Sequence, residues 1–108
     1  MMIARRQFKM YTVCMEGVQF TWDENKNRSN RRKHGVSFEE AQTAFFDPRA
    51  KVYFDPDHSE DEARFILLGV SYRLRVLVVC HCYRDKETVI RIISARRADK
   101  GEEEDYGR

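Results

Sequence analysis

The stretch that decides the fold is residues 64–95, RFILLGVSYRLRVLVVCHCYRDKETVIRIISA. It contains three runs rich in β-branched and aromatic residues, which favour strands. The runs are 64–70, 75–83 and 87–95. Short polar connections separate them, and this pattern is typical of strands joined as consecutive antiparallel hairpins. The sequence therefore predicts a three-stranded antiparallel meander at the centre of the fold.

A polar helix is predicted upstream of this meander, after a short strand at 19–22. Asp23 is suited to cap the helix, which ends at His34 because Gly35 can adopt the left-handed conformation that often follows a helix. The helix has almost no apolar residue, so it cannot be held by hydrophobic burial alone, and most of its surface must face water or a charged partner.

A second, amphipathic helix follows. Ser37 and Glu40 have the spacing of a capping box, and Pro48 ends the helix. The alternation at 51–55 predicts a further strand, and residues 98–106 are suited to a short C-terminal helix.

These elements predict an α+β domain over residues 18–108: a small antiparallel sheet with two N-terminal helices and a short C-terminal helix. The length of 108 residues suits one domain. Residues 1–17 show no clear period. We expect them to be an extension. Either this extension is disordered, or translation begins at Met15 and the residues before it are not made.

Alternation along the strands predicts which side chains share a face. Each strand has one apolar face and one face that mixes aliphatic residues with a polar group, namely Arg64, His81 or Arg91. We expect all three on one solvent-open face, because an unpaired buried arginine is costly. The plain interpretation is an ordinary solvated sheet in which Arg91 pairs with Glu62 or Glu87. The functional interpretation is that this face binds an anion, since arginine donates two parallel hydrogen bonds to phosphate.

Composition and charge narrow the class of protein. Charged residues make up 35% and hydrophobic residues 42%, and no apolar run is long enough to span a membrane. The N-terminus lacks a continuous apolar stretch, so we expect a cytoplasmic protein. Residues 26–34 are strongly basic and residues 102–105 are all acidic. This asymmetry indicates an anionic partner for part of the surface, or simply a solvated helix face.

The cysteines predict neither a disulfide framework nor a metal site. Their number is three, at Cys14, Cys80 and Cys82, and an odd count without framework spacing argues against disulfides. Cys80-His81-Cys82 does not have the spacing of known zinc motifs. We therefore expect no cofactor, and keep a metal site of Cys80, Cys82 and a histidine as a minor alternative.

Several short motifs occur in a specific order and spacing. They are WDENK (22–26), NRRKHGVSFEEA (30–41), DP (47–48), EARFILLG (62–69) and RIISARRA (91–98), with Tyr106 near the end. This series, spanning residues 20–106, resembles the BrnT family of type II toxins. One departure is Glu103, since family members often have an arginine after the tail glutamate. It puts a role of the tail in RNA binding in doubt.

The resemblance implies a RelE-like ribonuclease fold and an enzyme that cleaves RNA and blocks translation. It also implies a cognate antitoxin, BrnA-like, whose DNA-binding part resembles a ribbon-helix-helix protein and represses the shared operon. Toxin and antitoxin would form a hetero-oligomer, and operator DNA would be contacted only through the antitoxin.

Metal-independent RNA cleavage needs a base, an acid and cations that stabilise the charge on phosphorus. We expect Glu62 as base and His81 as acid, with Arg64 and Arg91 as the cations. His58 is a further candidate for acid or base. The residues expected to bind RNA are Lys26, Lys33, His34 and Arg96, of which His34 is also an acid or base candidate. The competing function is a non-catalytic RNA- or antitoxin-binding domain that acts as a co-repressor.

Overall fold

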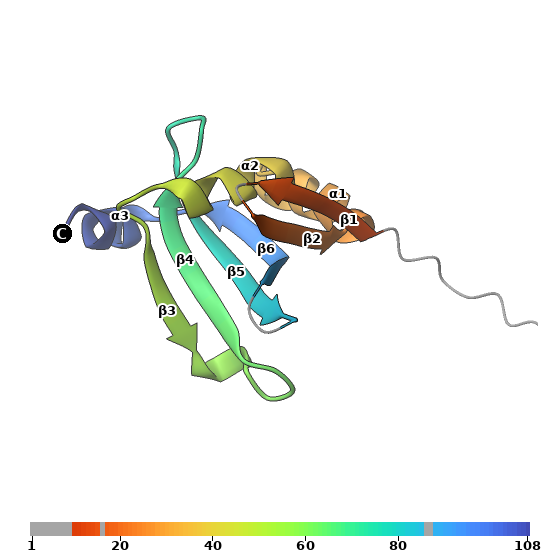
Figure 1. The fold of residues 1–108 in the computed structure, drawn as a ribbon. Helices are drawn as coiled ribbons and strands as arrows, with labels where there is room; N and C mark the ends of the chain where they lie inside the picture. The colour runs from red at the N-terminus through yellow and green to blue at the C-terminus, as the bar shows by residue number, and fades with distance from the viewer. Residues whose placement is uncertain (1–9, 16, 86–87) are drawn as a thin grey trace, which may run out of the picture.

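The computed structural model describes residues 10–15, 17–85 and 88–108. Six strands form one sheet in the order β1-β2-β6-β5-β4-β3 (Figure 1). The strands are β1 Met10–Met15, β2 Val18–Asp23, β3 Lys51–Asp55, β4 Arg64–Val70, β5 Val76–Arg84 and β6 Val89–Arg97. The helices are α1 Glu24–His34, α2 Phe38–Thr43 and α3 Lys100–Gly107, and two 3-10 helices are η1 Ala44–Phe46 and η2 Pro56–His58.

The predicted meander is confirmed, because β4, β5 and β6 pair as consecutive antiparallel neighbours and β3 adds to the free edge of β4. The predicted all-antiparallel sheet is wrong in one place. β2 lies parallel to β6, from Gln19 opposite Val89 to Thr21 opposite Arg91. The two strands are far apart in the chain, so no local pattern indicates their pairing.

β1 lies within the segment that the sequence analysis placed in an extension. It pairs antiparallel with β2, from Met10 opposite Asp23 to Met15 opposite Val18, and so adds an edge strand to the sheet. Residues 1–9 lie outside the described residues, and the boundary at residue 18 stays a prediction.

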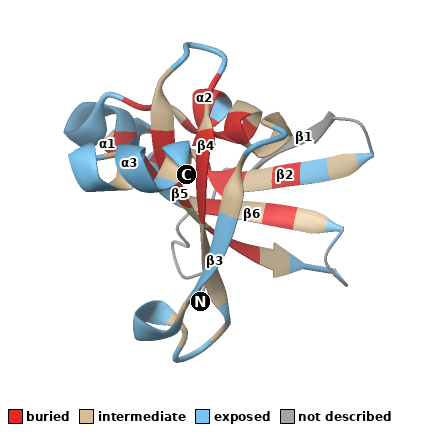
Figure 2. Ribbon diagram, turned by 90° about the vertical axis from the view of Figure 1, so that its left-hand side faces the viewer, coloured by how far each residue is buried: buried red, intermediate tan, exposed pale blue. Residues whose placement is uncertain are grey.

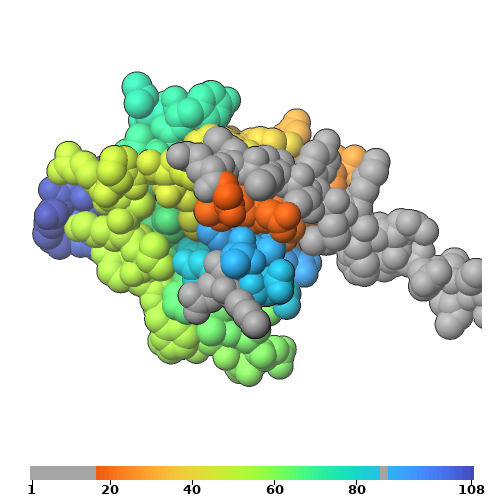
Figure 3. Space-filling view, viewed as in Figure 1, coloured from red at the N-terminus to blue at the C-terminus, as the bar shows by residue number. Residues whose placement is uncertain are grey.

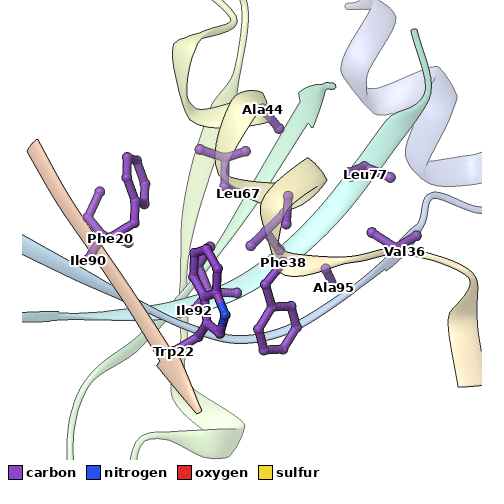
Figure 4. Packing of buried hydrophobic residues seen from close by; sticks show 12 residues of the cluster. Phe20, Trp22, Val36, Phe38, Ala44, Leu67, Leu77, Ile90, Ile92 and Ala95 are labelled. Carbon is purple, nitrogen blue, oxygen red and sulfur yellow. The ribbon is translucent and has the colours of Figure 1, made fainter. Parts of the chain in front are cut away.

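The hydrophobic core lies between the sheet and α2 with η1 (Figure 4). Phe20 and Trp22 of β2 are fully buried, and the Trp22 ring meets Phe38 of α2 edge-to-face at 6.1 Å between centroids. Gly69 allows η1 to approach β4, since a Cβ at this position would lie 2.8 Å from the carbonyl oxygen of Ala44. The core therefore occupies one face of the sheet.

Both predicted ends of α1 and the predicted start of α2 are confirmed, but α2 ends at Thr43, before the predicted stop at Pro48, and the chain continues as η1 to Phe46. The Asp23 side chain accepts a hydrogen bond from the amide of Asn25 at 2.9 Å, and Gly35 has a φ of +69° at the end of α1. The Ser37 hydroxyl accepts from the amide of Glu40 at 3.0 Å. The capping box is not completed, because the Glu40 carboxylate binds arginine and serine side chains instead.

Two buried asparagines attach α1 to its neighbours, Asn30 to β6 and Asn27 to α2. The Asn30 amide group donates to the carbonyl of Ala95 at 2.7 Å and to that of Val36 at 2.9 Å, and its oxygen accepts from the amide of Ala95 at 3.1 Å. Asn27 accepts from the amide of Phe38 at 2.8 Å. Since the pairing of β2 with β6 ends at Arg91, Asn30 acts as the strand neighbour that Ala95 would otherwise lack.

A buried ion pair joins α2 to the start of β5. Glu40, 2% exposed, binds the Arg75 guanidinium through both carboxylate oxygens and accepts from the Ser71 hydroxyl at 2.6 Å. Burial opposes ionisation of this carboxyl, but the hydrogen bonds from Arg75 and Ser71 outweigh it and lower the pKa of Glu40.

Asn30→Ala is expected to destabilise the fold by about 2–4 kcal/mol, because it leaves buried backbone groups of Ala95 and Val36 without partners. Urea unfolding followed by circular dichroism measures the change. The control is Asn25→Ala, an exposed position on the same helix, for which a change within about 0.5 kcal/mol is expected. Equal effects of the two substitutions would contradict this role for Asn30.

Glu40→Gln is expected to cost about 2–3 kcal/mol at pH 7, where the wild-type carboxylate is charged and bound to Arg75. The folded-state pKa of Glu40 is lowered, so its contribution is present above the ordinary carboxyl pKa of about 4.5 and is lost as the pH falls through the folded-state value. The difference in unfolding free energy between the two proteins should therefore shrink below about pH 4.5. A difference independent of pH would contradict the ionic contribution.

Candidate functional site

The sheet has one face covered by α2 and η1 and a second, open face that carries the candidate site. Register places Arg64, Cys80 and Ser94 on the open face, because Ile66 lies opposite Cys80 and Cys80 lies opposite Ser94. A β-bulge separates this last pair from His81 and Ile92 and leaves Ile93 as an extra residue in β6. The bulge brings Ser94 to the same face as Arg91, whereas strict alternation predicts the opposite face.

His81 is not on the open face, and the prediction that it lies beside Arg64 and Arg91 is wrong. Its strand partners are Phe65 and Ile92, and its side chain is fully buried. The ring is 4.8 Å from that of Phe45 and 5.2 Å from that of Tyr83. Burial lowers the pKa of His81, so the imidazole is a neutral part of an aromatic cluster.

A pocket of about 270 Å³ is hollowed into the open face. Side chains from four strands, η2 and the end of α1 line it. Its polar lining residues are His34, Asp55, His58, Arg64, Cys80, Ser94 and Arg96. The fold thus brings two histidines and two arginines, which come from four separate segments of the chain, to one concave surface.

His58 is held by a carboxylate. Its Nδ1 lies 2.9 Å from Oδ2 of Asp55, whose other oxygen accepts from the amide of Asp57 at 3.2 Å and so caps η2. The His58 side chain is 69% exposed. A carboxylate on Nδ1 favours the tautomer with the proton on that nitrogen and leaves Nε2 facing outward as an acceptor.

Cys80 lines the pocket together with Arg64 and Ser94, and these two side chains are the neighbours that act on its thiol. Burial raises the pKa of the thiol, and these two partners lower it by less. The thiol is therefore protonated near neutral pH and is a poor nucleophile.

Glu62 and Arg91 lie near the same end of the open face, on either side of Cys82. Oε1 of Glu62 accepts from the Cys82 thiol at 3.6 Å, and its other oxygen is 3.1 Å from a nitrogen of Arg84. Arg91 is the strand partner of Cys82. The predicted pairing of Arg91 with Glu62 does not form, since Glu62 pairs with Arg84, and Glu87 lies outside the described residues. Glu62 also lines a second hollow with His58 and Arg64.

Arg96 reaches the pocket but is bound by the C-terminal helix. Two of its nitrogens donate to the two carboxylate oxygens of Glu102 at 2.8 Å each. The hydrogen bonds from Arg96 lower the pKa of Glu102. Tyr106 fixes the other end of α3 by donating to Asp47 at 2.6 Å. An anion that binds Arg96 must therefore compete with Glu102.

The predicted RNA-binding residues are in two places. His34 and Arg96 line the pocket, whereas Lys26 and Lys33 are exposed on α1 and do not line it. The sequence analysis missed Asp55 as the partner of His58. The Asp-Pro-Asp-His order could have indicated it, because an aspartate often caps the residues that follow it.

Residues 10–15, 17–85 and 88–108 contain no group of three or more histidine, cysteine or acidic residues arranged to hold a metal ion. Within the same ranges, no helix has the length and apolar character needed to cross a membrane.

Comparison with known proteins supports the resemblance seen in the motifs. Residues 22–102 match the family model described as "Ribonuclease toxin, BrnT, of type II toxin-antitoxin system". This chain belongs to the BrnT family. The chain is also similar to the Brucella abortus ribonuclease toxin BrnT, whose crystal structure was solved at 1.1 Å resolution. The TM-score is 0.57 at 26% identity, over 73% of this chain and 94% of the Brucella chain. No curated protein sequence matches.

BrnT membership places the chain among the ribonuclease toxins of type II toxin–antitoxin systems. The family match covers α1 to the start of α3, and so includes every strand that lines the pocket. The α+β class predicted from the sequence is confirmed by the likeness to the Brucella structure.

Proposed function

We propose that this chain is a metal-independent endoribonuclease that cleaves RNA in the pocket on the open sheet face. The observation that supports the proposal is the meeting of His34, His58 and Arg64 around one hollow, with His58 oriented by Asp55. Two imidazoles and a guanidinium supply a base, an acid and a cation, which are the groups that RNA cleavage without a metal requires.

In the proposed reaction, Nε2 of His58 takes the proton of the 2′-hydroxyl, and the 2′-oxygen attacks phosphorus. The bond from phosphorus to the 5′-oxygen breaks, and His34 donates a proton to that leaving oxygen. The products are a 2′,3′-cyclic phosphate and a 5′-hydroxyl end. Arg64 binds the non-bridging phosphate oxygens, whose negative charge grows in the transition state.

Glu62 remains the second candidate for the base, as the motif first indicated. It lines the hollow next to the pocket together with His58 and Arg64. Both of its carboxylate oxygens already have partners, Cys82 and Arg84, which is why we assign the base to His58. Arg91, on the same face, is proposed to bind a neighbouring phosphate. Because His81 is on the other face, we assign it no role in the chemistry.

The exposed basic side of α1 is proposed to serve RNA and antitoxin alike. Arg31, Arg32 and Lys33 are exposed in its last turn, and Lys26 is exposed near its start. They offer phosphate contacts whose contribution falls with salt. An acidic segment of the antitoxin could cover the same surface and compete with RNA.

We propose the wider role as well, and family membership supports it. The chain inhibits translation in the cytoplasm by cleaving RNA, and has a RelE-like fold. A BrnA-like ribbon-helix-helix antitoxin neutralises it in a hetero-oligomer and alone contacts operator DNA.

The test is cleavage of a short RNA by the purified full chain in EDTA, with products identified by mass spectrometry. His58→Ala and His34→Ala are each expected to lower the rate by about 10²–10⁴-fold, the contribution of a positioned acid or base. Arg64→Ala should lower it by about 10²–10³-fold. A substrate with a 2′-deoxynucleotide at the cleavage site should not be cut.

The controls are His81→Phe, which keeps an aromatic ring in the buried cluster, and Arg49→Ala, an exposed arginine that does not line the pocket. Both should keep activity near the wild-type rate if they remain folded. A larger loss in Glu62→Gln than in His58→Ala would transfer the base role to Glu62. RNA binding without products in any buffer would contradict the enzyme and favour the co-repressor function.

A further inference from the structure

β3 is an edge strand with apolar side chains exposed on both of its faces. Val52, Tyr53 and Phe54 are 49%, 47% and 55% exposed, although neighbouring residues of a strand point to opposite sides. Register puts Tyr53 on the open face, beside Ile66, and Phe54 on the other face, beside Phe65. Figure 2 looks onto this edge, where the middle of β3 is coloured as exposed.

A neighbour that continues the sheet places side chains beside the exposed residues on both faces of the strand at once. A ligand bound to one face would leave the other apolar side chain in water. Exposed edge strands present unpaired backbone groups that readily pair with another strand. In the space-filling view, β3 (yellow-green) lies on the outer flank of the molecule, near α3 (Figure 3).

The sequence of β3, KVYFD, is complementary to itself when two copies run antiparallel. With Tyr53 opposite its own copy, Val52 faces Phe54 and Lys51 faces Asp55 of the other chain. Each type of pair stabilises an antiparallel sheet: aromatic with aromatic, aromatic with β-branched, and opposite charges. In their own chain, Lys51 already donates to the carbonyl of Asp105 and the Asp55 carboxylate already accepts two hydrogen bonds. An ammonium has three donors and a carboxylate has further acceptor sites, so both groups can still form the pair.

We infer that β3 is a dimerisation strand that pairs with β3 of a second copy of this chain. The register centred on Tyr53 matches odd residues with odd and even residues with even, as antiparallel pairing requires, because two directly opposed residues either both point their backbone groups toward the other strand or both point them away from it. The arrangement is two-fold symmetric, and the free edge of β3 in each chain is paired with that of the other. No β3 edge is left for a third chain, so the assembly is a dimer. The two sheets become one, with both open faces on the same side.

This dimer does not depend on the ribonuclease chemistry, and its failure would leave the proposed function intact. Its consequence for function is geometric. The two pockets would lie on one continuous surface, on which a single RNA strand could contact both chains.

The experiment is analytical ultracentrifugation of the full chain over a range of concentrations. The wild type is expected to reach a dimer and no larger species. Tyr53→Lys and Tyr53→Glu each place like charges opposite one another at the two-fold axis and should weaken the dimer by about ten-fold or more. An equimolar mixture of these two variants should recover it, because opposite charges then face each other.

The matched control is Tyr72→Lys, at a tyrosine 70% exposed in the β4–β5 loop, which should dimerise like the wild type. Urea unfolding of each variant checks that the fold is kept. A monomeric wild type at the highest soluble concentration would overturn the inference, as would association that ignores both Tyr53 variants or continues beyond two chains. Loss of antitoxin binding in Tyr53→Lys, with no change in self-association, would also overturn it and assign the edge to the antitoxin.

Discussion

The hydrogen bonds between the Asn30 side chain and the backbone of Ala95 determine where α1 lies. α1 has no apolar side chain to bury, so these bonds hold it against the end of β6, and the bond from Phe38 to Asn27 holds it against the start of α2. This position brings His34, the last residue of the helix, to the rim of the pocket. It also turns the charged residues of α1 outward. One polar contact therefore positions both a pocket residue and the basic surface beside it.

Local signals in the sequence predicted the parts of the fold that neighbouring residues determine. Asp23, Gly35 and Ser37 mark helix ends because a cap needs only the residues next to it. The parallel pairing of β2 with β6 and the addition of β1 could not be predicted in this way. Both depend on contacts between distant segments. The residue types of β2 predict a strand, but they do not indicate which strands pair with it.

The candidate site was predicted in part for a similar reason. Arg64 and Arg91 do share the open face, since two residues on separate strands can be compared once the strands pair. His81 was misplaced because register sets it opposite Phe65, one residue out of step with Arg64. A single histidine among aliphatic residues carries no signal that separates a solvent face from an aromatic cluster. The bulge at Ile93 places Ser94 on the face that carries the pocket, and no residue pattern in the sequence predicts this bulge.

The central claim is that RNA is bound on the open face around the pocket, and an NMR titration tests it most directly. The ligand is a short RNA whose 2′-hydroxyls are methylated, so that the 2′-oxygens cannot attack phosphorus and the RNA binds without being cut. We expect the amide signals of His58, Arg64 and Ser94 to shift together with increasing ligand, while those of Phe38 and Ala41 on the covered face stay in place. Shifts confined to α2 and β2 would contradict it.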